Sequence, residues 1–85
     1  MPRAKKTVKM FGRFVVSDPE ICHGSPTFRG TRILVADVLE QVAEGQSWDA
    51  ISDGWRGAVK PAAIAEALRI ANQAFEDHAA EYTAV

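Results

Sequence analysis

The feature that most constrains this fold is a helical period of apolar residues that starts at residue 35. Val35, Val38, Leu39 and Val42 are spaced i, i+3, i+4 and i+7, which places them on one face of a helix. A longer stripe with helical spacing follows at Ile64, Ala67, Leu68, Ala71 and Phe75. Two helices with apolar stripes must bury them against each other or against a third element, so the sequence predicts a helical bundle.

Capping residues divide this part of the chain. Gly45 is expected to end the first helix, because glycine readily adopts the left-handed conformation that follows many helices. Ser47 is the predicted N-cap of a short second helix, whose Ala50, Ile51 and Trp55 are expected to face the core.

A third helix is predicted from Lys60-Pro61 to about Asp77, since proline is tolerated in the first turn. Three short-looped helices with the longest last are typical of a helix-turn-helix bundle.

The residues before this bundle predict strands. Residues 11–16 and 31–35 are rich in β-prone side chains, and residues 17–30 hold the glycines and prolines of a loop. We therefore expect a mainly α fold with a small N-terminal β-hairpin. Its length of 85 residues suits one domain, assigned to residues 11–77, with a flexible basic arm at 1–10 and a tail or helix extension at 78–85.

Charge is distributed unevenly along the chain. Residues 1–32 carry a net +5 and residues 33–85 a net −6, which together give the −1 of the whole chain. Such asymmetry is typical of a protein with one end that faces a polyanion and one that meets a different partner. The alternative is that the two halves meet within the molecule or across a dimer.

Catalysis and metal binding have weak support. Asp18, Cys22, His23 and Ser25 share one loop, without the separate base, orienting group and oxyanion site that a hydrolase needs. A site with ligands Asp18, Cys22 and His23 would lack familiar zinc spacing. We therefore expect no enzyme activity, no metal and no cofactor. The single cysteine and the charged N-terminus predict a cytoplasmic protein.

Two segments could bind nucleic acid, the basic arm and the third helix. We place Ala63 and Glu66 on the outward face of the third helix. The candidate DNA-binding residues are Arg3, Lys5, Lys6, Lys9, Lys60, Arg69, Asn72 and Gln73, because their side chains donate to phosphates or base edges. Glu66 argues against this role, since a carboxylate is repelled by phosphate. The acidic C-terminal residues Glu76, Asp77 and Glu81, with Tyr82, are candidates for covering a basic protein surface.

The loop and first helix carry a family resemblance. Residues 18–35 read D-P-E-I-C-H-G-S-P-T-F-R-G-T-R-I-L-V, which resembles the D-P, G-x-P, G-T-R-[IV]-x-V signature of the domain of unknown function 433 family. The matching positions are Asp18, Pro19, Gly24, Pro26, Gly30, Thr31 and Arg32. The similarity covers about residues 14–72, but residues 55–60 depart from the family's usual Tyr-Pro segment.

The resemblance implies a winged-helix or homeodomain-like fold that is dimeric through the hairpin. It also implies an antitoxin of a toxin–antitoxin pair, which binds a PIN-like nuclease toxin and regulates transcription at its own operator DNA. A protein-interaction module with no DNA-binding role is the alternative, and a small enzyme or metal protein built on the Cys22-His23 loop is a third hypothesis.

Overall fold

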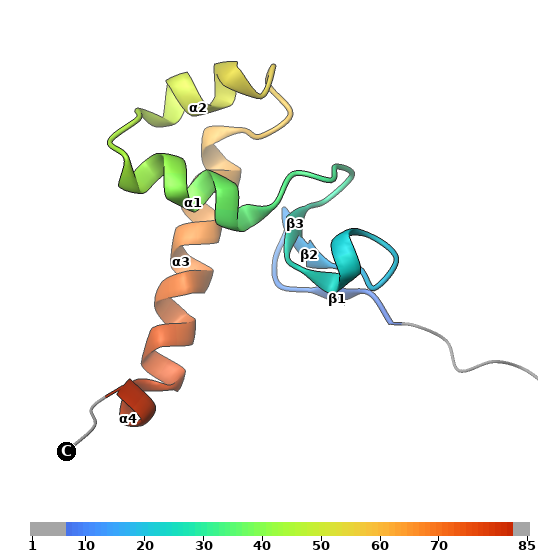
Figure 1. Cartoon of the computed structure of the whole chain (residues 1–85), viewed down its shortest axis with the longest axis vertical. Helices are drawn as coiled ribbons and strands as arrows, with labels where there is room; N and C mark the ends of the chain where they lie inside the picture. The colour runs from blue at the N-terminus through green and yellow to red at the C-terminus, as the bar shows by residue number, and fades with distance from the viewer. Residues whose placement is uncertain (1–6, 83–85) are drawn as a thin grey trace, which may run out of the picture.

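The computed structural model describes residues 7–82, which fold into a small sheet beside a group of helices (Figure 1). The helices are α1 (Val35–Ala43), α2 (Trp48–Gly54), α3 (Pro61–Asp77) and the short α4 (Ala79–Tyr82). The strands are β1 (Lys9–Met10), β2 (Val15–Ser17) and β3 (Thr27–Phe28), and a 3-10 turn, η1 (Cys22–Gly24), precedes β3. Helices combined with a small N-terminal sheet are thus confirmed.

The helix ends lie where the capping residues predict. Gly45 follows α1 with a φ of +87°. The Ser47 hydroxyl caps α2 by accepting a hydrogen bond from the Ala50 amide at 3.1 Å. Pro61 is the first residue of α3, and Asp77 is its last. Each of these positions has a local chemical reason, so no tertiary contact is needed to explain it.

The core lies where α1, α2, α3 and β2 meet. Val38, Ile51 and Ile64 are fully buried, and Val15 and Phe28 close the core from the sheet. Burying each large aliphatic side chain contributes roughly 1.5–3 kcal/mol. The indole N–H of Trp55 donates to Gln41 at 2.8 Å and ties the end of α2 to α1.

Two core expectations are wrong. Ala50 is exposed, because its neighbour Ile51 takes the inward position on α2. Phe75, at the end of the predicted α3 stripe, is 62% exposed. Figure 1 gives the reason: α1 and α2 lie beside the N-terminal half of α3, and its C-terminal half extends beyond them.

The predicted hairpin is also wrong in its strands. The sheet is antiparallel with the order β1-β2-β3, and it pairs Met10 with Val16 and Val16 with Thr27. Residues 31–35 form no strand, because a turn and a bend occupy residues 29–31 and only Leu34 pairs with Thr27 before α1 begins. Residues 9 and 10, assigned to a flexible arm, form β1.

Candidate binding surfaces

The strongest polar contact between the sheet and the helices is centred on Glu66 of α3. Its carboxylate accepts hydrogen bonds from three consecutive backbone amides, those of Arg13 at 2.8 Å, Phe14 at 2.7 Å and Val15 at 2.9 Å. Arg13 and Phe14 lie in the turn from β1 into β2, and Val15 is the first residue of β2. Hydrogen bonds to an ionised acceptor are among the stronger ones in proteins.

The pKa of Glu66 shifts because of this environment. Desolvation alone would raise the pKa, but the three backbone hydrogen bonds and the positive charge of Arg69 hold it below the ordinary value of 4.5. The carboxylate is therefore ionised at neutral pH, and its charge is directed at the backbone of the turn.

Gly12 makes room for this carboxylate. A Cβ atom at position 12 would lie 2.6 Å from the Glu66 Cδ atom, which is closer than such atoms approach. The sequence placed Glu66 and Ala63 on the outward face of α3, and both assignments are wrong. Ala63 is only 2% exposed, and Glu66 is turned toward the β1–β2 turn. Glu66 therefore adds little negative charge to any outward DNA-facing surface.

The signature residues build the loop between β2 and α1. The Asp18 carboxylate accepts a hydrogen bond from the Glu20 amide at 2.9 Å, which forms an Asx turn. Gly24 has a φ of +86°, and a Cβ atom there would lie 3.9 Å from the backbone of Pro19. Val35, the first residue of α1, donates its amide hydrogen to the Pro26 carbonyl oxygen at 3.0 Å.

The G-T-R part of the signature makes a second turn. Gly30 has a φ of +80°. The Thr31 hydroxyl donates to the Phe28 carbonyl oxygen at 2.7 Å and accepts from the Ile33 amide at 2.9 Å. The Arg32 side chain is exposed, and its carbonyl oxygen accepts from the half-buried Cys22 thiol at 3.7 Å. These contacts give the signature a structural role, because they set where α1 begins.

The predicted DNA-binding residues do not form one surface. Arg3, Lys5 and Lys6 lie outside the described residues. Lys9 is exposed on β1, where its Nζ atom lies 5.0 Å from the centroid of the Phe11 ring. Lys60, the N-cap of α3, lies nine residues and thus two and a half helical turns before Arg69, so the two face opposite sides of α3.

Arg69, Asn72 and Gln73 are exposed and share one side of α3. The Gln73 amide donates to the Asp77 carboxylate at 2.9 Å, so that side carries an acidic neighbour. Lys60 instead lines a small pocket with Arg29, Phe14 and Phe28, between the sheet and the start of α3.

The predicted protein-binding residues gather at the far end of α3. Glu76 and Asp77 are exposed in its last turn, and Glu81 is exposed in α4 with a carboxylate oxygen 2.5 Å from His78 Nδ1. Tyr82 ends α4. Residues 70–85 contain neither lysine nor arginine, which makes this end of the molecule acidic.

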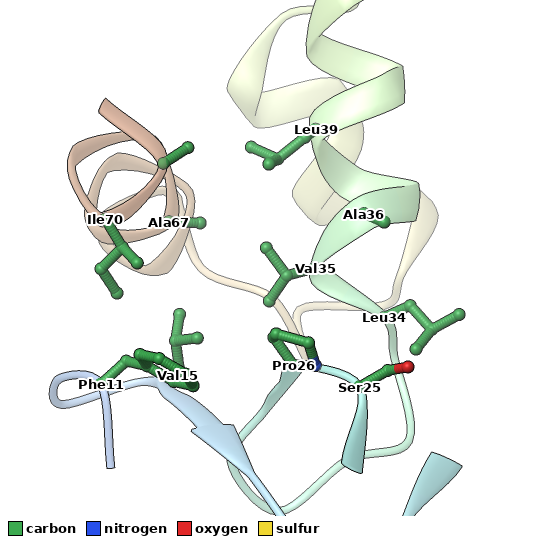
Figure 2. A pocket seen from close by; sticks show the side chains of 11 residues that line it. Phe11, Val15, Ser25, Pro26, Leu34, Val35, Ala36, Leu39, Ala67 and Ile70 are labelled. Atoms are coloured by element: carbon green, nitrogen blue, oxygen red, sulfur yellow. The ribbon is translucent and has the colours of Figure 1, made fainter. Parts of the chain in front are cut away.

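An apolar groove, which the sequence does not predict, opens between the sheet, α1 and α3 (Figure 2). Its volume is about 340 Å³, and Ser25 is the one polar residue among those that line it. Val35 and Leu39 form the α1 side, and Ala67 and Ile70 form the α3 side. Phe11, which is 37% exposed, stands at the sheet side.

Residues 7–82 contain neither a cluster of metal-binding side chains nor a helix that could span a membrane. No three His, Cys, Asp or Glu side chains in this part of the chain lie close enough to hold a metal ion together. None of its helices combines the length and the apolar character needed to cross a membrane.

Comparison with known proteins places this chain among relatives of unknown function. It is 40% identical over 58 residues to the uncharacterized protein y4eO of Sinorhizobium fredii. The match covers 68% of this chain but 24% of that relative, so the chain spans about a quarter of the relative's length. No solved structure matches it. The model of the family described as protein of unknown function DUF433 matches residues 15–71, from β2 into α3. This chain therefore belongs to the DUF433 family.

Proposed function

We propose that this chain is a non-catalytic, antitoxin-like protein of a toxin–antitoxin pair. It acts in the cytoplasm as a homodimer, binds a PIN-like nuclease toxin, and regulates transcription by binding its own operator DNA. The helices adopt a winged-helix or homeodomain-like arrangement, in which α3 faces the DNA.

The observation that carries this proposal is the exposure of α3 beyond its core contacts. Its first half is held by α1, α2 and the sheet, while every described residue from Asn72 to the end of the helix is exposed. A helix held at one end and exposed at the other suits macromolecular recognition, as in helix-turn-helix proteins. The inward orientation of Glu66 supports a DNA role, since it removes a carboxylate from the outward side of α3.

The DNA role is tested with purified chain and its upstream duplex, against a scrambled duplex, by fluorescence anisotropy across a salt series. We expect selective binding that weakens steeply with salt, because phosphate contacts release counterions. Arg69→Ala should reduce affinity by roughly 5- to 30-fold, which is the loss of one charged contact. Arg32→Gln removes the same charge from the loop and serves as the matched control.

Binding of the nuclease toxin is tested by substitutions at the acidic C-terminal end of the described chain. Asp77 and Glu81 would pair with a basic nuclease surface, which increases the rate of association more than the affinity. The double variant Asp77→Lys, Glu81→Lys should slow association with the nuclease at low salt, whereas Glu44→Lys, at the C-cap of α1, should not. Equal association rates for both variants would contradict this placement.

A protein-interaction module with no DNA role is the second candidate. Two observations favour it: Arg69 is the one lysine or arginine within α3, and an apolar groove lies beside the helix. No selectivity for the upstream duplex at any salt concentration, with or without the nuclease, would favour this second candidate.

A further inference from the structure

We propose that two copies of this chain pair through their α3 helices, with Phe75 of each copy seated in the apolar groove of the other. The inference rests on the homodimer of the proposed function, and it places the contact on α3 in place of the N-terminal hairpin that the family resemblance implies. Its test reads the oligomeric state alone, so it can fail or succeed separately from toxin and DNA binding.

The groove supplies one half of the contact. Two of the residues that line it, Val15 and Val35, belong to the buried core, and Ser25 is the one polar residue among the others. Its volume of about 340 Å³ suits one or two large side chains. An apolar hollow that reaches the core of so small a protein is typical of a site that a partner side chain fills.

Phe75 supplies the other half. At 62% it is the most exposed of the large apolar side chains in the described part of the chain. Phe75 lies one helical turn after Ala71, and Ile70 lies one turn before Ala74, so these four residues form a continuous strip along α3. The alanines let a second helix approach closely, and Ile70 and Ala71 also line the groove.

The small side chains of Ala71 and Ala74 set the register of this pairing, because the two helices can approach most closely there. In this register the two α3 helices run antiparallel, and the two-fold axis passes between Ala71 and Ala74. The numbers of two residues that face each other then add up to 145. Phe75 of one copy then lies opposite Ile70 of the other, at the groove. The level of Glu66 then lies close to the end of the second α3 helix, whose last residue is Asp77.

Charge complementarity favours a second copy over an unrelated partner. The β1–β2 turn is held at the level of Glu66, and it carries the exposed cation Arg13, with Lys9 beside Phe11 at the groove. The register brings these cations to the acidic end of the second copy, where Asp77 ends α3 and Glu81 lies in α4. Both contacts occur twice in a two-fold dimer, so the surface is complementary to itself.

The same carboxylates are proposed above for the toxin. A second copy and a toxin would therefore compete for the acidic end of α3, and each would weaken the binding of the other.

The first experiment is sedimentation equilibrium of the full chain without nuclease or DNA. We expect a monomer–dimer equilibrium in which Phe75→Ala raises the dimer dissociation constant by at least roughly 30-fold, the cost of a central apolar anchor. Trp48→Ala removes an exposed aromatic side chain from α2 and should leave the constant unchanged. The proposal would be overturned if the wild-type chain stays monomeric over a roughly 100-fold range of protein concentration. It would also be overturned if the Phe75→Ala variant dimerises like wild type.

The second experiment exchanges the charges. One variant carries Lys9→Glu and Arg13→Glu, and the other carries Asp77→Lys and Glu81→Lys. Each alone should dimerise at least roughly 10-fold more weakly at low salt, because like charges would meet at both ends. Their mixture should form a heterodimer, since all pairs are again opposite in sign. Variants that dimerise normally alone, or a mixture that forms no heterodimer, would contradict the register.

Discussion

Replacement of Glu66 by glutamine should weaken the attachment of the sheet to α3. In the wild type, one carboxylate accepts three backbone hydrogen bonds from residues 13–15, which lie 51 to 53 positions away in the chain. A glutamine side chain has one acceptor oxygen, and its NH2 group would face backbone donors. At least one of the three amides therefore loses its partner.

The expected loss in the free energy of unfolding follows from the environment of each of the three amides. A typical hydrogen bond contributes about 1 kcal/mol net, and one to a charged group contributes more. The bond from the Arg13 amide is exposed and contributes least, while those from Phe14 and Val15 are partly buried. We expect Glu66→Gln to lower the free energy of unfolding by about 1–2 kcal/mol at pH 7. In a domain of this size that lowers Tm by roughly 4–16 °C.

The effect should depend on pH in a defined direction. The folded-state pKa of Glu66 lies below its ordinary value of 4.5, so the ionised carboxylate stabilises the fold fully above that value. This contribution is lost as the pH falls through the folded-state pKa. The difference between wild type and Glu66→Gln should therefore be constant above about pH 5.5 and shrink below pH 4.5.

Urea unfolding followed by tryptophan fluorescence measures this difference, because Trp55 is bonded to α1 and reports on the core. Glu76→Gln, on an exposed turn of the same helix, is the matched control. A Glu66→Gln variant within 0.5 kcal/mol of wild type at every pH, or a difference that grows on acidification, would refute the reasoning.

Three further substitutions test local features of the fold by the same unfolding assay. Gly12→Ala should lower the free energy of unfolding by about 1–3 kcal/mol, because its Cβ atom would meet the Glu66 carboxyl group. The loss should be smaller in a Glu66→Ala background. An equal loss in both backgrounds would contradict the contact. Thr27→Val should stabilise the fold by about 1 kcal/mol, because the fully buried Thr27 hydroxyl has no partner among the described residues; a loss of stability would show that the hydroxyl is satisfied. Ser47→Ala should cost about 1 kcal/mol through the lost N-cap, whereas Ser47→Asp should cost much less; equal losses would exclude the cap.

The helices could be predicted from sequence because their signals are local. Apolar spacing, Gly45 after α1, Ser47 before α2 and Pro61 at the start of α3 each act within one or two turns. The sheet was harder to predict. Its strands contain two or three residues, too few for a period to show, and turn geometry rather than strand propensity decides where β3 ends.

The binding surfaces depend on distant contacts, which explains why the sequence misplaced Glu66. Nothing near Glu66 in the chain shows that the amides of residues 13–15 will lie beside it. The apolar groove likewise depends on three elements meeting, and its lining residues are indistinguishable in sequence from a closed core. Phe75 continues the core spacing but is 62% exposed, and the C-terminal half of α3 extends beyond α1 and α2 (Figure 1).

The central claim, that this chain is an antitoxin, is tested most directly by neutralisation of a nuclease. Purified chain is titrated into the PIN-like nuclease encoded beside its own gene, and RNA cleavage is measured. We expect cleavage to stop at a fixed stoichiometry, and the Asp77→Lys, Glu81→Lys variant to need a higher concentration. Cleavage that continues unchanged at saturating chain, or the absence of any such nuclease beside the gene, would contradict the claim.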